Sequence, residues 1–102
     1  MAEVQTSTSS SGEMTLRFIE FVQMHSQNIA FCLGRIPNPQ DGKATVNLAF
    51  AKMLIDQLAA IAERTKGNLS EDEDKVLQNA LASLRLAFVE TQQSQQKSQA
   101  SQ

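Results

Sequence analysis

The segment 48–89 contains two amphipathic patterns separated by a short turn, and this arrangement constrains the fold more than any other feature. Apolar residues in 48–65 recur at intervals of three and four, which places them on one face of a helix. The segment 70–89 repeats this spacing. Because so short a connection forces consecutive helices to lie side by side in opposite directions, we expect an antiparallel helical hairpin. Its inward stripes are Leu48, Ala51, Leu54, Ile55, Leu58, Ile61, Ala62 and Thr65, then Leu77, Ala80, Leu81, Leu84 and Phe88.

Capping residues mark the ends of these two helices. Asn47 is a candidate N-cap, because its side-chain oxygen can accept a hydrogen bond from a first-turn amide. Gly67 suits the left-handed position that ends a helix. Ser70 and Glu73 have the spacing of a capping box, in which each side chain bonds the backbone amide of the other residue. The acidic run 71–74 is therefore interpreted as a charged, capped first turn rather than a binding site.

A further helix is predicted over residues 14–33. Gly34 and Pro37 end it, since glycine suits the C-terminal stop and proline blocks continuation. Residues 35–46 hold two prolines and an Asp-Gly turn signal and are predicted to be a loop. This loop is long enough to place the helix on either side of the hairpin, or to exchange it between subunits. The apolar stripe of the helix is Phe18, Phe21, Val22, His25, Ile29 and Cys32.

The predicted fold is all-α, with one domain over residues 14–90. It is a three-helix unit made of the first helix, the Pro-rich loop and the antiparallel hairpin. Residues 1–13 are rich in Ser and Thr, and residues 91–102 in Gln and Ser, so both are predicted to be disordered tails.

Composition excludes several function classes. Apolar residues make up 41% of the 102 positions and the formal net charge is −2, which gives no general attraction to nucleic acid or anionic membrane. The single cysteine, Cys32, allows no internal disulfide and fits a reducing compartment. No signal-peptide pattern and no membrane-length apolar run are present, so we expect a soluble cytoplasmic protein.

Several short motifs carry a family resemblance. These are residues 65–70 with Glu73 and Leu77, the Leu-Gly-x-Ile-Pro-x-Pro pattern of 33–39, and the residues Ile55, Asp56, Leu84, Arg85, Phe88 and Val89. In these motifs the chain resembles, over about 18–90, a family of small bacterial proteins catalogued as domain of unknown function 1844. The resemblance implies a bacterial helical protein and no activity. Phe88 departs from the tyrosine expected there, which removes a hydroxyl from any catalytic argument.

The residues that carry chemistry are few. His25 is the only histidine and lies within an apolar stripe, which favours a core or interface role over a proton-linked or ligand role. Asp56 lies opposite the apolar face, where a solvated position with Lys52 competes with a contact to Arg85, the loop or another subunit. No catalytic residue, cofactor or metal site is predicted, because two Cys or His residues cannot complete a structural zinc site. The candidate polar site is His25, Asp56 and Arg85.

Apolar side chains outside the main stripes point to self-association. A helix with two apolar faces requires two partners, and a two-fold dimer that forms a larger bundle supplies the second. Higher oligomers and a separate protein partner remain open. The candidate interface residues are Met24, Phe31, Ala82, Leu86 and Val89.

The function expected from these features is a non-catalytic helical module for oligomerisation or protein interaction. One alternative is binding to nucleic acid or the ribosome surface through residues 35–46, where Arg35 and Lys43, with Lys66 at the turn, would form a modest basic patch. Another alternative is a small ligand-binding or enzymatic site at a subunit seam.

Overall fold

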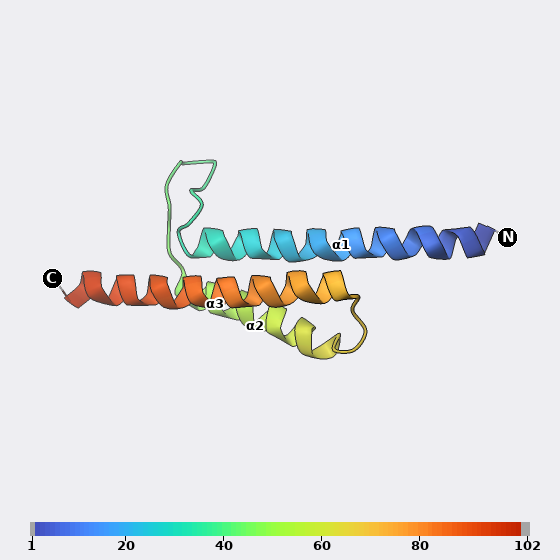
Figure 1. Ribbon diagram of the computed structural model, residues 1–102. Helices are drawn as coiled ribbons and strands as arrows, with labels where there is room; N and C mark the ends of the chain where they lie inside the picture. Colours follow the sequence, from blue (N-terminus) through green and yellow to red (C-terminus); the bar gives the residue numbers. More distant parts are fainter. Residues whose placement is uncertain (1, 101–102) are drawn as a thin grey trace.

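The computed structural model describes the backbone of residues 2–100 and the side chains of residues 12–97. It contains α1 (Ala2–Cys32), α2 (Leu48–Arg64) and α3 (Glu71–Ala100). Figure 1 shows that α1 and α3 run in the same direction and that α2 runs in the opposite one. Each helix packs against the other two. The predicted all-α, three-helix fold with its antiparallel hairpin is confirmed.

The core lies along the line where the three helices meet. Val22 and Ile29 of α1, Leu58 of α2 and Leu77 of α3 are each less than 2% exposed. All four belong to the stripes expected from the three-and-four spacing, so burial follows the helical period. Around them lie the other buried apolar residues, which are Leu33, Ala51, Leu54, Ile55, Leu81 and Leu84.

Both predicted caps of the hairpin are present. The Phe50 amide donates to Oδ1 of Asn47 at 3.0 Å, which makes Asn47 the N-cap of α2. The Ser70 amide donates to Oε1 of Glu73 at 2.9 Å, and the Glu73 amide donates to Oγ of Ser70 at 3.2 Å. Gly67 has a φ of 83°, a conformation that residues with a Cβ rarely adopt. These contacts confirm the capping box and the glycine stop.

The segment 33–47 leaves the end of the bundle as a long loop and returns to it (Figure 1). Its base is closed by an antiparallel bridge between Leu33 and Val46 and by the Asn47 amide, which donates to the Cys32 carbonyl at 2.7 Å. Gly34 at this base has a φ of 71°, and a Cβ there would lie 3.0 Å from Cγ2 of Val46. The loop thereby packs α1 against the hairpin of its own chain.

Helical backbone also continues through 2–13 and 91–100, segments where the sequence predicts disordered tails. Thr91 is buried and its hydroxyl donates to the Ala87 carbonyl at 2.8 Å. The side chains of residues 92–97 are all exposed. A helix without packing on one face is marginal in water, and the disorder of the two tails stays a prediction.

Phe21 belongs to the predicted apolar stripe of α1, but its side chain is not buried in the core. Its side chain is 41% exposed, whereas the neighbouring Val22 is 1% exposed. Successive residues of a helix are turned by about 100°. The stripe therefore centres on Val22 and Ile29, and Phe21 lies on the flank that faces α2.

We expect Leu77→Ala to lower the free energy of unfolding by about 2–5 kcal/mol, because it leaves a cavity where a fully buried side chain stood. Leu16→Ala is the matched control, since Leu16 is 50% exposed on α1 and should change stability by less than about 1 kcal/mol. Urea unfolding followed by circular dichroism measures both. Equal effects of the two substitutions would contradict this core.

Candidate functional site

His25 lies at the edge of the core, between α1 and α2. Its Nε2 is 2.9 Å from the Leu54 carbonyl oxygen, and since a carbonyl only accepts, Nε2 is the donor. The imidazole also stacks on Phe21, with ring centroids 5.6 Å apart. This bond joins residues 29 apart in sequence and fixes how α1 is placed along α2. No carboxylate or nucleophile bonds His25 within the described residues.

Cys32 is half-buried at the C-terminal end of α1. Burial raises the pKa of its thiol, because desolvation disfavours the thiolate. The thiolate is the reactive form of cysteine. Cys32 packs against the core beside residues of the loop.

Asp56 lies on the outer face of α2. Lys52 Nζ is 2.8 Å from its Oδ2, and the two side chains are 66% and 63% exposed. An exposed pair one turn apart on a helix contributes little to stability. The sequence left open whether Asp56 is solvated or contacts Arg85, the loop or another subunit. Within the single chain, its side chain is solvated.

Arg85 of α3 lines an open cleft of about 610 Å³ between α2 and α3. Other charged side chains line it too, namely Glu63, Lys66, Glu71 and Asp74. Lys66 Nζ lies 3.7 Å from Oε2 of Glu63. Arg85 has no hydrogen bond or ion pair within the described residues. Among the described residues, no group of three or more His, Cys, Asp and Glu is placed to hold a metal ion.

The three residues of the candidate polar site are therefore not brought together. His25 lies between α1 and α2, Asp56 on the outer face of α2, and Arg85 at the α2–α3 cleft. Sequence reasoning missed the cleft. Its only sequence signal is the pair Ala59 and Ala62, whose small side chains line it.

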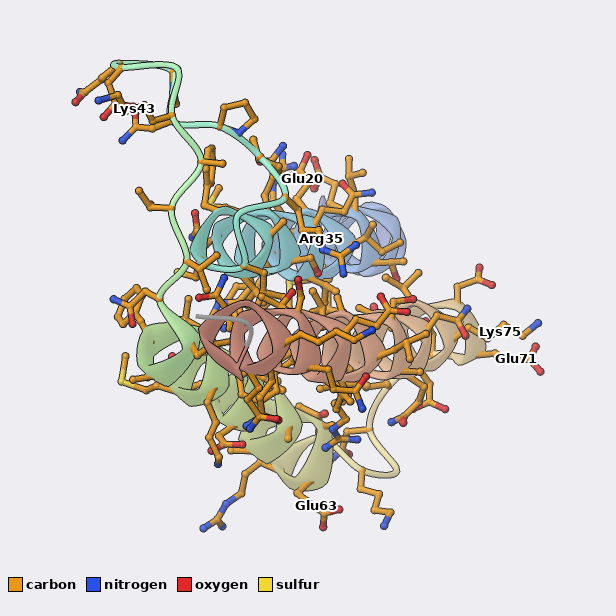
Figure 2. The ribbon with its side chains drawn as sticks, turned by 90° about the vertical axis from the view of Figure 1, so that its left-hand side faces the viewer. Glu20, Arg35, Lys43, Glu63, Glu71 and Lys75 are labelled. Atoms are coloured by element: carbon orange, nitrogen blue, oxygen red, sulfur yellow. The ribbon has the colours of Figure 1, made fainter. Side chains whose placement is uncertain are left out.

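The basic residues proposed for nucleic-acid binding are also separated. Arg35 Nη2 lies 3.1 Å from Oε1 of Glu90, so its charge is paired with α3. Figure 2 shows Lys43 on the part of the loop that projects from the bundle, away from Arg35. Lys66 lies in the α2–α3 turn, at the opposite end of α2 from the loop (Figure 1). The three cations do not form one patch.

Most of the exposed large apolar side chains fall into two groups, one on α1 and α2 and one on α3. The first, the α1–α2 face, consists of Met14, Phe21, Met24, Phe50 and Met53, which are 41–67% exposed. The second, the outer face of α3, has Leu86 at 60% and Val89 at 44% exposure, with Ala82 exposed beside them.

Four of the five predicted interface residues are thus exposed: Met24, Ala82, Leu86 and Val89. Phe31 differs, because it is half-buried in a cleft that it lines with Ile36 and Pro39 of the loop. Loop residues of the same chain therefore lie beside Phe31, which was predicted to contact a second subunit. Whether these residues form an interface stays a prediction.

A protein-family model described as "Domain of unknown function (DUF1844)" matches residues 15–90. The chain belongs to this family. The match begins at Thr15 and ends at Glu90, so it covers the packed part of all three helices and the loop between α1 and α2. Neither the curated proteins nor the solved structures gave a match. No helix within the described residues is long and apolar enough to cross a membrane.

Within this DUF1844 domain, Glu73 links the start of α3 to α1. Its carboxyl group should make the stability of the fold depend on pH. Thr15 Oγ1 donates to its Oε2 at 2.7 Å, and the Ser70 amide donates to its Oε1. The Ser70 amide, and then the Thr15 hydroxyl, lower the pKa of the Glu73 carboxyl. A pKa lower in the folded than in the unfolded state stabilises the fold above the unfolded value. That stability is lost as pH falls through the folded value.

We therefore expect Glu73→Gln to flatten the loss of stability of this protein on acidification, measured as urea midpoints between about pH 7 and pH 3. Glu71→Gln is the control, because Glu71 lies in the same turn but accepts no hydrogen bond within the described residues. If both variants follow the wild-type pH dependence, the Glu73 bonds do not form in solution.

Proposed function

We propose that this DUF1844 protein is a non-catalytic helical module that acts by self-association and by docking of protein partners. The observation that supports it most directly is the exposure of large apolar side chains on two surfaces. Met24 on the α1–α2 face is 64% exposed, and Leu86 on the outer face of α3 is 60% exposed. Contiguous exposed apolar surface on a small domain is typical of a binding surface. Neither surface is needed for the core of the chain itself.

The small core supports the same proposal. Ten apolar residues are buried among the described side chains of 12–97, and a single core of this size supplies only a few kcal/mol. Burial of the remaining apolar faces between two copies would add to that stability, since anything that binds only the folded state stabilises it. Two-fold pairing is the simplest closed arrangement.

The dispersed polar residues support a role without catalysis. A catalytic base requires a partner within hydrogen-bond reach, whereas His25 bonds a backbone carbonyl and Asp56 bonds Lys52. The proposed module uses no cofactor. It acts in the cytoplasm, the location expected from the sequence. Binding through the 35–46 loop is not favoured, because Arg35 is already paired with Glu90.

We expect the solution mass to exceed that of the 11.2 kDa monomer over a wide concentration range, measured by multi-angle light scattering. A charge on an associating surface should shift the mass towards the monomer, so at least one of Met24→Glu and Leu86→Glu should do so. Leu16→Glu is the matched control, because Leu16 is half-exposed on α1 but lies outside both surfaces.

Circular dichroism should show that the variants keep their helices, since all three positions are exposed. A wild-type monomer at every concentration would contradict self-association. A pull-down with the wild-type protein would then test the docking of a partner protein on the exposed faces.

A further inference from the structure

The outer face of α3 carries a heptad pattern. Its residues follow alternating intervals of three and four, the spacing of the a and d positions in a coiled coil. Position a falls on Asn79, Leu86 and Gln93, and position d on Ala82, Val89 and Gln96; all six are exposed. The centre of the series is apolar and both ends are polar.

This seam points directly away from the chain's own core. Leu77, Leu84 and Thr91, seven residues apart, occupy the f positions of the same heptads and are 0%, 8% and 8% exposed. In a coiled coil, f lies opposite the a/d seam. A second helix can therefore lie along the outer face of α3 without displacing α1 or α2.

We propose that the occupant is α3 of a second copy of this chain, lying parallel and in register across a two-fold axis. This rests on the self-association proposed above and names its surface. Arg85 occupies a g position and Glu90 the e position five residues later, which is the spacing of an interhelical ion pair in a parallel coiled coil. The two-fold axis forms this pair twice.

The charges around Arg85 and Glu90 fit this arrangement. Arg85 has no ion pair within the described residues, whereas Arg35 binds Oε1 of Glu90 at 3.1 Å. A carboxylate accepts several hydrogen bonds, so Glu90 can bind Arg35 and the partner subunit's Arg85 together. The neighbouring g–e pairs would be Gln78 with Ser83 and Gln92 with Lys97, and neither opposes like charges.

An antiparallel pairing does not use these charges. It sets g against g and e against e, so that in the register that keeps Leu86 beside Val89, Arg85 would meet Gln92 and Glu90 would meet Ser83. Asn79 and Gln93 add to the specificity, since polar a residues restrict register at some cost in stability. Because Leu77, Leu84 and Thr91 pack α3 into its own core, pairing does not have to supply the entropy of helix formation over 77–91.

Within the described residues, the α1–α2 face has no charged residues that would specify how a second copy binds to it. The ion pairs on its two helices, Arg17 with Glu20 and Lys52 with Asp56, are each completed within one helix. They set no register between subunits. The α2–α3 cleft holds charges of both signs and no feature that selects a ligand. Only on the outer face of α3 do the described residues, Arg85 and Glu90, indicate what binds there.

Disulfide trapping tests the register in the full chain. In a Cys32→Ser background, we expect Ala82→Cys, Val89→Cys and Gln96→Cys each to form a symmetric disulfide under mild oxidation, because d positions meet their own counterparts in a parallel dimer. An antiparallel dimer links at most one of the three. Ala60→Cys, on the outer face of α2, is the exposed control and should stay monomeric on non-reducing gels.

Charge exchange tests the ion pair. Arg85→Glu and Glu90→Arg should each raise the dimer Kd about tenfold, because each creates two like-charge contacts. An equimolar mixture of the two variants should recover wild-type affinity as heterodimers, since both opposite-charge pairs are then restored. Arg35→Ala controls for the contact that Glu90→Arg also removes within the chain, and it should leave the Kd within about twofold of wild type.

The outcomes separate this inference from the proposed function. Three trapped positions together with recovery in the mixture support the parallel α3 dimer. A wild-type dimer that Met24→Glu dissociates and that traps at none of the three positions overturns it while self-association stands. A wild-type monomer overturns both.

Discussion

Burial of one line of aliphatic side chains holds the three helices together. Ile29, Leu58 and Leu77 come from three different helices and are all fully buried. Each buried side chain of this size contributes about 1.5–3 kcal/mol, so few of them are dispensable in a domain this small. A polar contact at the edge of this line, from His25 Nε2 to the Leu54 carbonyl, then fixes how α1 is placed along α2.

The sequence predicted the parts of the structure that depend on near neighbours. The hairpin follows from apolar spacing, and its ends follow from Asn47, Gly67 and the Ser70–Glu73 box, whose bonds span only three residues. These signals are local, because a cap or a helical stripe is specified within one or two turns of chain. The structure therefore adds distances to the hairpin but no new element.

The remaining features depend on residues far apart in sequence. Thr15 bonds Glu73 across 58 positions, and His25 bonds Leu54 across 29. No periodicity specifies such pairs, since a modest rotation of α1 exchanges Phe21 for its neighbours at the core. The cleft at Arg85 was missed for the same reason: it exists only where two particular helix faces diverge. The three residues of the candidate polar site lie apart within one chain, because residue type alone does not bring side chains together.

In the proposed dimer, the two faces of α3 would contact two different partners. Its inner face follows Leu77, Leu84 and Thr91, and its outer face follows Ala82, Leu86 and Val89. The inner face gains its stability within the chain and orders the helix, which presents the outer residues as a rigid row. Alone, a row with only three apolar residues would be too short to hold a coiled coil. Attached to a folded bundle, the same row would need to supply only the contact between the subunits of the proposed dimer, because packing within the bundle already forms the helix.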